Sequence, residues 1–314
     1  MNGYKTRTRT RKKPVDNPVL FEFLIDGENN KTVISFTKHD YEQTKPPRFL
    51  NDTNISFFMQ YHLENHVDKE LRDKIHIFNS FFFDKIKSMK LEGSIKTCTS
   101  RWLKGVTLFD KDFLILPVCE KDHWILIIIC YPYNTPTIRS YKIPDEKLYE
   151  PAVIVMNSFH RCAPSVKKIL SQFLKFCWDH ERGSIRSFTI NNAKPNGIRL
   201  RFPSLPQQTN DYNCGVFILN YLYCFLKDPR GSYLRMFRKL PMTSWFKENK
   251  IDIGAERRKM QKVIEEQIKI WENSELKARL DRERGAISPS KDSTIVITEE
   301  DGNGNHQDNI IVIH

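Results

Sequence analysis

Two long apolar segments follow one another across a three-residue polar break, and they constrain the fold more than any other feature of the chain. Residues 112–119 read DFLILPVC and residues 123–131 read HWILIIICY. Each segment has the length of a strand, and neither alternates apolar with polar residues, as a strand with one solvated face does. We therefore predict a sheet that has helices on both of its faces.

Helical patterns flank these strands. Asn51 and Asp52 are capping residues at the start of one predicted helix, and Pro164 suits the first turn of another. The sequence predicts helices at 51–65, 76–89, 164–182, 215–227 and 255–280, with a third strand at 152–159. Because helices come first, then the sheet, then further helices, this order indicates an α+β fold.

Charge divides the chain into three parts. The 314 residues carry a formal net charge of +12, but the first 17 hold six basic residues and one acid, and the last 30 hold five acids and one lysine. Neither end has the apolar residues of a packed core. We expect a disordered basic arm at 1–17, one catalytic-sized domain at 18–284 and an acidic, flexible tail at 285–314.

The basic arm and the cysteines bear on location and partners. The arm suits a nuclear-import signal, a contact with nucleic acid or a solubilising tail. Seven cysteines at irregular spacings, without a CxxC pair, favour a reducing compartment. The N-terminal residues lack an apolar stretch, so no secretory signal is expected, and no apolar run reaches the roughly 18 residues of a membrane span. We expect a monomer in the nucleus, with the cytoplasm as a further location, no membrane partner, and nucleic acid bound only through the arm.

One cysteine stands at the seam between a polar loop and a helix. In PQQTNDYNCGVFILNYLYCFL (206–226), turn-forming residues give way to a helical apolar pattern at Cys214. A helix N-terminus offers N–H groups and a dipole that stabilise a thiolate. A structural core thiol is the alternative interpretation, so Cys214 alone does not decide the function.

The order of four polar residues favours a nucleophile. His123 opens the second apolar strand, Asn157 lies near the end of the third, and Gln208 precedes Cys214 by six residues. Thiol catalysis needs a base, a group that holds the imidazole tautomer and a donor to the oxyanion. His123, Asn157 and Gln208 can supply these in turn, although each of them taken singly is more often structural.

Five segments resemble the Ulp/SENP family of SUMO-specific cysteine proteases, in the family's order over roughly residues 30–270. They read FLNDTNISFFMQYHL, HIFNSFFFDKI, DKDFLILPVCEKDHWILIIICYP, AVIVMNSFHRCAPS and PQQTNDYNCGVFILNYL. The last of them, with LPMTSWF (240–246), resembles most closely the divergent branch that mainly trims poly-SUMO chains. The resemblance implies a papain-like fold with a central mixed sheet flanked by helices.

The resemblance also implies roles for single residues. It makes Cys214 the nucleophile and His123 the base. Asn157 is then the group that orients the imidazole, and Gln208 is the donor to the oxyanion. Trp124 resembles the aromatic lid over the Gly-Gly end of the modifier, and Trp102 the second wall of the same tunnel. A narrow aromatic slot admits glycines and excludes bulkier residues, although core packing is the alternative role for either tryptophan.

Two positions depart from the family pattern. Asn157 and Asn213 stand where the family usually has Asp, the latter directly before the nucleophile. A neutral Asn orients imidazole through its carbonyl oxygen, but it stabilises the imidazolium less than a carboxylate does. The pattern predicts a slower, working enzyme, with a catalytically weak or inactive SUMO-binding scaffold as the alternative.

The acidic tail contains a candidate contact of its own. Ile295, Val296 and Ile297 form a β-branched run flanked by acids, and residues 308–314 read as a second, weaker copy. Such a segment can add to the edge of a partner sheet, and it resembles a SUMO-interacting motif. The alternative is a terminal edge strand of the domain.

Together these features predict a SUMO-specific isopeptidase that removes SUMO from lysines or trims poly-SUMO chains. SUMO and SUMO-conjugated proteins are the expected partners, and a protease for another ubiquitin-like modifier is a further alternative. No cofactor and no metal are expected, because HLENH (62–66) has Glu64 in the wrong position for a zinc hydrolase.

Overall fold

The structure is a computed structural model. It describes residues 17–26, 31–88, 103, 106–133, 149–159, 164–182, 190, 198–242, 245–246, 250–274, 278, 298–300 and 306–308. Two compact units divide the chain, Met1–Ile268 and Lys269–His314. Residues 1–16 of the predicted basic arm lie outside the described residues, so the disorder expected there stays a prediction.

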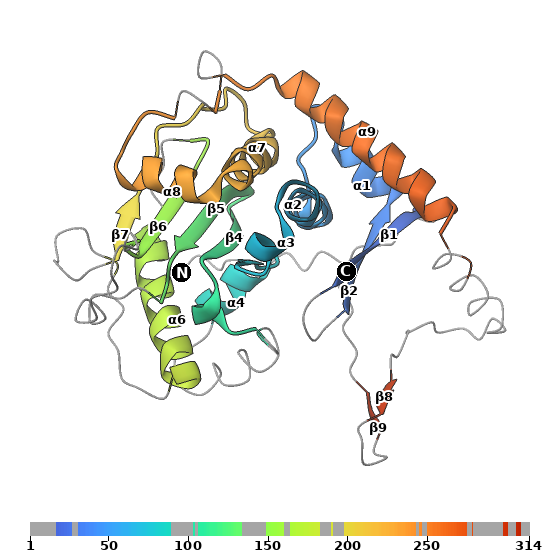
Figure 1. The fold of residues 1–314 in the computed structure, drawn as a ribbon. Coiled ribbons are helices and arrows are strands. Elements are labelled where there is room, and N and C mark those ends of the chain that lie inside the picture. The colour runs from blue at the N-terminus through green and yellow to red at the C-terminus, as the bar shows by residue number, and fades with distance from the viewer. Residues whose placement is uncertain are drawn as a thin grey trace, which may run out of the picture. The chain divides into compact units, whose positions relative to one another are not determined.

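A mixed five-stranded sheet forms the centre of the first unit (Figure 1). Its order is β3 (Ile75–Ile77), β4 (Phe113–Glu120), β5 (His123–Cys130), β6 (Ala152–Met156) and β7 (Arg199–Arg201). The central strands β4, β5 and β6 are antiparallel, and the edge strands β3 and β7 run parallel to their neighbours. The mixed sheet confirms the predicted α+β class, and β4, β5 and β6 confirm the three predicted strands.

A two-residue turn joins β4 to β5. Lys121 and Asp122 both have positive φ, 53° and 61°, as in a type I′ turn, whose twist matches that of the strands it joins. Pairing begins immediately at Glu120 and His123. The turn therefore fixes His123 at one end of the sheet, as the first residue of β5.

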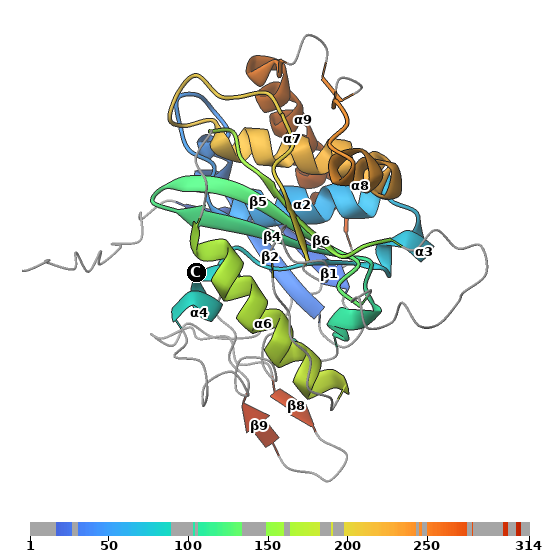
Figure 2. The same ribbon diagram turned by 90° about the vertical axis from the view of Figure 1, so that its left-hand side faces the viewer.

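Helices cover both faces of the sheet, as the continuous apolar strands predict (Figure 2). On one face lie α7 (Cys214–Lys227) and α8 (Pro229–Phe237), and on the other α4 (Phe82–Ser88) and α6 (Pro164–Arg182). Phe113 of β4 meets Phe225 of α7 with ring centroids 5.2 Å apart. On the opposite face, Ile127 joins an apolar core with residues of α4 and α6.

A hairpin and three helices precede the sheet. They are β1 (Val19–Asp26), β2 (Lys31–Thr37), α1 (Lys38–Gln43), α2 (Asp52–His66) and α3 (Lys69–Arg72). The predicted cap of α2 is confirmed, because the Asn51 side chain accepts the backbone N–H of Asn54. The sequence prediction lacks the hairpin, which buries Phe21 and Phe36 in a stack at 4.8 Å.

The helix predicted at 76–89 is wrong in its first half. Ile75–Ile77 forms β3, which pairs with β4, and α4 begins only at Phe82. Between them the Asn79 side chain accepts the backbone N–H of Phe81 at 3.1 Å, a local bond typical of turns. The apolar run at 75–78 suits a strand or a helix, so its pairing with β4 decides the outcome. A single-turn helix, η1 (Leu108–Asp110), leads into β4.

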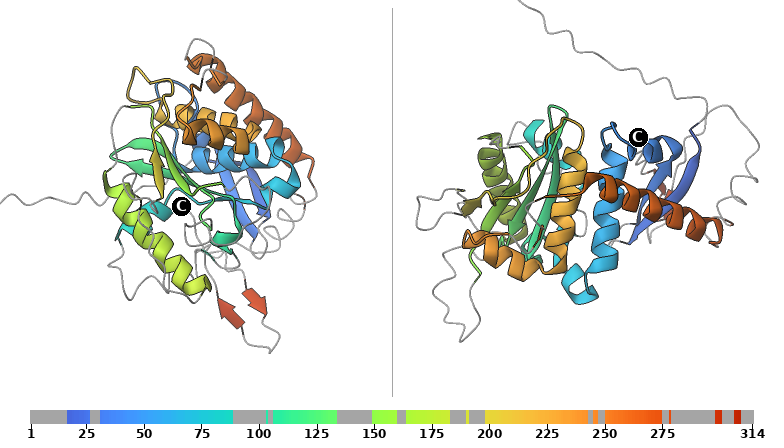
Figure 3. Two further views of the ribbon diagram at one scale, coloured as in Figure 1. Left: turned by 60° about the vertical axis from the view of Figure 1, so that its left-hand side comes forward. Right: turned by 90° about the horizontal axis from the view of Figure 1, so that it is seen from above.

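The helix α9 (Ile253–Glu272), most of which belongs to the first unit, ends earlier than the helix predicted at 255–280. Asp252 caps it, accepting the backbone N–H of Ala255 at 2.9 Å. Figure 3 shows α9 running along the part of the unit that contains α1 and α2. No helix of the described residues is both long and apolar enough to cross a membrane.

In the second unit, β8 (Thr298–Glu300) and β9 (His306–Asp308) pair with each other in an antiparallel ladder. The apolar run Ile295, Val296 and Ile297 lies outside the described residues, as do residues 309–314. The proposed SUMO-interacting motifs therefore stay predictions.

Candidate active site

The candidate nucleophile is the first residue of α7. Cys214 follows Asn213 at the helix N-terminus and is only 1% exposed. Burial raises the pKa of its thiol, while backbone N–H groups of Trp124, Gly215 and Cys214 and the charge of Arg257 act in the opposite direction with a smaller effect. Burial therefore disfavours the thiolate, and a base is needed to remove the thiol proton.

Close packing at Leu50 fixes the start of α7 against the start of β5. A Cβ atom on Gly215 would lie 2.9 Å from the Cβ atom of Leu50, so only glycine allows the helix to approach this closely. The carbonyl oxygen of Leu50 accepts the indole N–H of Trp124 at 3.0 Å. The residue after the nucleophile and the residue after His123 thus share one neighbour.

The predicted base and its orienting group are hydrogen-bonded. Nε2 of His123 lies 2.7 Å from Oδ1 of Asn157, which follows the last residue of β6. The same oxygen accepts the backbone N–H of Phe159 at 2.9 Å, and the Phe159 ring lies 4.9 Å from the imidazole. Because Oδ1 is an acceptor, Nε2 donates, which leaves the lone pair of the neutral ring on Nδ1.

The loop before α7 is tied to the residue next to Asn157. The backbone N–H of Gln208 donates to the carbonyl oxygen of Ser158 at 3.0 Å, and the Ser158 hydroxyl donates to Oε1 of Gln208. The amide Nε2 of Gln208 donates to the carbonyl oxygen of Asn210. An amide has two N–H donors, so this contact occupies one of them and leaves a second for an oxyanion.

Not every predicted residue is placed with the others. Trp124 is 4% exposed and its backbone N–H reaches the Cys214 thiol, while its role as a lid over the modifier stays a prediction. Trp102 lies outside the described residues, and its role as a second wall stays a prediction. Sequence reasoning missed Ser158 and Arg257, both buried, since a serine after a strand and an arginine in the charged run ERRK both suit a solvated surface.

The first prediction concerns Asn157. Asn157→Ala should slow turnover by about 100-fold, the lower end of what general-base catalysis contributes, because the imidazole loses its tautomer lock. Asn157→Asp keeps the acceptor and should remain active, and it can be faster because a carboxylate stabilises the imidazolium. Steady-state cleavage rates for the three proteins measure this. If Asn157→Ala cleaves at the parental rate, Asn157 is only a turn residue.

Comparisons with known proteins identify the family of this chain. Residues 48–260 match the Ulp1 protease family, C-terminal catalytic domain. The probable ubiquitin-like-specific protease 2B of Arabidopsis thaliana is 33% identical over 238 residues, covering 73% of this chain and 25% of that protein. Sentrin-specific protease 7 of Rattus norvegicus is 24% identical over 298 residues, covering 76% of this chain and 28% of that protein. The chain thus spans about a quarter of the length of these relatives.

A solved structure shares the fold. It is described as the crystal structure of the de-sumoylating protease, and it superposes with a TM-score of 0.64 at 17% identity, covering 85% of this chain and 98% of that chain. The family match over residues 48–260, more than half of the chain, shows that the chain belongs to the Ulp1 protease family.

Proposed function

We propose that this protein is a SUMO-specific isopeptidase with a Cys-His-Asn mechanism. The observation that carries the proposal is the hydrogen bond between His123 and Asn157. The next residue after His123 is Trp124, whose backbone N–H reaches the Cys214 thiol. Membership of the Ulp1 family supports a thiol protease. The names of the relatives, which are ubiquitin-like-specific and sentrin-specific proteases, support a ubiquitin-like modifier as the substrate.

In the proposed first step, His123 takes the thiol proton and the thiolate attacks the carbonyl carbon of the C-terminal glycine. The resulting oxyanion accepts hydrogen bonds from the Gln208 side chain and from the backbone N–H of Cys214. His123 then gives its proton to the departing lysine amine, which leaves a thioester on Cys214. Water hydrolyses the thioester, with His123 taking a proton from that water.

The slot for the modifier is proposed on sequence grounds together with the position of Trp124. The Trp124 indole donates to the carbonyl oxygen of Leu50, and in this proposal it forms one wall of the slot. Trp102 is the proposed opposite wall. A glycine-glycine end fits between flat aromatic surfaces, and a residue with a side chain does not.

The test is cleavage of two matched substrates. One carries SUMO on the side chain of a lysine in a short peptide, and the other carries ubiquitin on the same lysine. Cleavage of the SUMO conjugate alone supports the proposal, and cleavage of the ubiquitin conjugate alone assigns another modifier. Binding of SUMO without cleavage of either conjugate contradicts the proposal and identifies a scaffold.

The tail is proposed to make the enzyme prefer poly-SUMO chains. A site that recognises one SUMO through its C-terminus has no inherent preference for chains, whereas a tethered second contact raises the local concentration of chain substrates. Ile295, Val296 and Ile297 with the acids that follow suit this contact. The acids should make the contact weaker in high salt.

The second prediction tests the tail. Removal of residues 286–314 should spare the cleavage of a single SUMO-peptide conjugate and slow the depolymerisation of chains, more so as chains lengthen. Alanine at Ile295, Val296 and Ile297 in the full chain is the matched variant and should reproduce the defect. Gel-based rates on chains of defined length measure it. Equal rates for truncated and full-length protein on a long chain would contradict the contact.

The location is proposed to be the nucleus. The clustered basic residues of the arm at 1–17 suit an import signal. Imaging of a fluorescent fusion with and without the arm tests this proposal. Exclusion of the intact fusion from the nucleus would contradict the location, and unchanged nuclear fluorescence without the arm would contradict the arm as the import signal.

A further inference from the structure

Arg257 of α9 is a charged side chain in the interior of the first unit. It is 2% exposed, and burial lowers the pKa of its guanidinium, although arginine stays protonated in proteins. A buried charge is costly unless it is paired or fully hydrogen-bonded. The partners of Arg257 therefore indicate why a charged side chain is buried at this position.

Every oxygen that Arg257 contacts among the described residues is neutral. Its guanidinium nitrogens donate to Oδ1 of Asn213 at 2.9 and 3.3 Å and to the carbonyl oxygen of Tyr212 at 3.3 Å. They also donate to the carbonyl oxygens of Gln43, Thr44 and Arg48 at 3.4, 2.8 and 2.8 Å. The planar guanidinium of arginine suits this many acceptors. Among the described residues, no carboxylate pairs with the positive charge of Arg257.

These contacts hold the nucleophile from both sides. Tyr212 and Asn213 are the two residues directly before Cys214, and Arg48 lies two residues before Leu50, which packs against Gly215. One side chain therefore links the loop before α7 to the segment that limits the position of α7. The guanidinium is also close enough to Cys214 for its charge to favour the thiolate.

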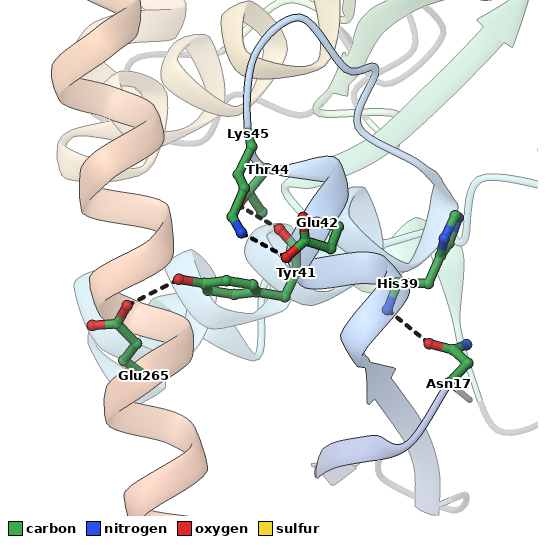
Figure 4. Close-up of polar contacts among 7 residues, drawn as sticks. All are labelled: Asn17, His39, Tyr41, Glu42, Thr44, Lys45 and Glu265. Carbon is green, nitrogen blue, oxygen red and sulfur yellow. Dashed lines mark hydrogen bonds and ion pairs between the residues drawn. The ribbon is translucent and has the colours of Figure 1, made fainter.

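A separate contact fixes the helix that carries Arg257. The Tyr41 hydroxyl of α1 donates to Oε1 of Glu265 on α9 at 3.0 Å (Figure 4). Glu265 lies two turns beyond Arg257 along α9, and Figure 4 shows Tyr41 reaching from α1 across to it. This contact anchors α9 on α1 without placing a charge at the thiol.

Among the described residues, the other titratable groups around the thiol do not supply a fixed positive charge. Burial raises the pKa of Cys119 at the end of β4 to about 12, with Asp52, Cys214 and Asp122 acting in the same direction. Tyr212 lies with its ring 5.9 Å from the guanidinium carbon. His123, the proposed base, changes its charge during the reaction.

We propose that Arg257 is a positioning residue for Cys214, and that the neutral Asn213 leaves its charge available to stabilise the thiolate. Asn213 orients the guanidinium of Arg257 without neutralising its positive charge. An aspartate at 213 would form a buried ion pair with Arg257 instead, and the field of the guanidinium at the nucleophile would be weaker. The proposal rests on Cys214 as the nucleophile of the proposed function.

The third prediction is the effect of Asn213→Asp on the free protein. The added carboxylate cancels the charge of Arg257, so the pKa of the Cys214 thiol rises and less thiolate is present at neutral pH. Alkylation of Cys214 by iodoacetamide, followed by mass spectrometry of its peptide against pH, should be about tenfold slower near pH 7, with the difference vanishing at high pH. The melting temperature should rise, because Arg257 gains a charged partner.

Two variants at other positions separate charge from packing. Arg257→Gln in the Asn213 background should also slow alkylation near pH 7 and should lower the melting temperature, because carbonyl oxygens lose their donors. Arg258→Gln removes the same charge from the exposed neighbour of Arg257 and should leave the alkylation profile unchanged. Tyr41→Phe removes only the contact with Glu265 and should leave the profile unchanged too, because the hydrogen bonds of Arg257 itself remain.

The outcomes are distinct. A pH profile of Asn213→Asp that overlays the parental profile overturns the proposal, even if Arg257→Gln fails to fold. A profile that shifts equally in Arg258→Gln would also overturn it, since a general charge effect would then explain the result. Because alkylation needs no modifier, the assay remains informative even if the protein does not cleave SUMO.

Discussion

Cys214→Ser is expected to abolish isopeptide cleavage, with a loss of roughly 10⁴-fold or more, and to leave SUMO binding intact. The exchange removes one sulfur atom from a buried position, and the serine hydroxyl is too weak an acid for His123 to deprotonate efficiently. Cleavage of a SUMO-lysine conjugate and binding of free SUMO, measured on the same preparation, give the two readouts.

Cys224 provides a matched control on the same helix. It is half-buried, and burial raises the pKa of its thiol to about 11, so it stays protonated like an ordinary core thiol. Cys224→Ser should therefore cleave at close to the parental rate. Loss of cleavage in Cys224→Ser but not in Cys214→Ser would remove Cys214 from the mechanism.

Gln208→Ala is expected to lower turnover by about 100-fold, the usual effect of removing one oxyanion donor. The loss should fall on kcat, with KM little changed, because the oxyanion exists only in the transition state and the intermediate. Gln208→Glu separates this role from packing. It keeps the oxygen that accepts the Ser158 hydroxyl and removes the N–H donor, so it should be as slow as Gln208→Ala.

Gln207 is the neighbouring control for this prediction. Its Nε2 donates to the carbonyl oxygens of Asn157 and Leu205 at 3.3 and 2.9 Å, so it supports the loop without reaching an oxyanion in the proposed mechanism. Gln207→Ala should cost less than about tenfold. Parental turnover in Gln208→Glu would show that the amide donates nothing to the reaction.

Sequence periodicity predicts the centre of this fold because the central strands are buried on both faces. The runs that become β4 and β5 have the length of strands and are apolar almost throughout, and the Asn51 cap marks the start of α2 directly. The outer elements are different. β3 has only three residues and exists through its pairing with β4, and β1 and β2 carry a mixed pattern because only one face of their hairpin is buried.

The same distinction applies to the site. His123 and Asn157 are predictable because each stands at the end of a predicted strand, and strand ends meet at one edge of a sheet. Arg257 is not predictable from the sequence, because its neighbours along the chain are charged. Its contacts come from segments more than 40 residues away along the chain. Long-range packing, rather than local pattern, gives that residue its environment.

The most direct test of the account uses SUMO with an electrophile in place of its C-terminal carboxylate, next to a matched ubiquitin probe. The full chain should form a covalent adduct with the SUMO probe, and peptide mass spectrometry should place it on Cys214 alone. Asn157→Ala should form the adduct more slowly, and Cys214→Ser should form none. An adduct with neither probe, or one formed on a different cysteine, would contradict the assignment of a SUMO isopeptidase that acts through Cys214.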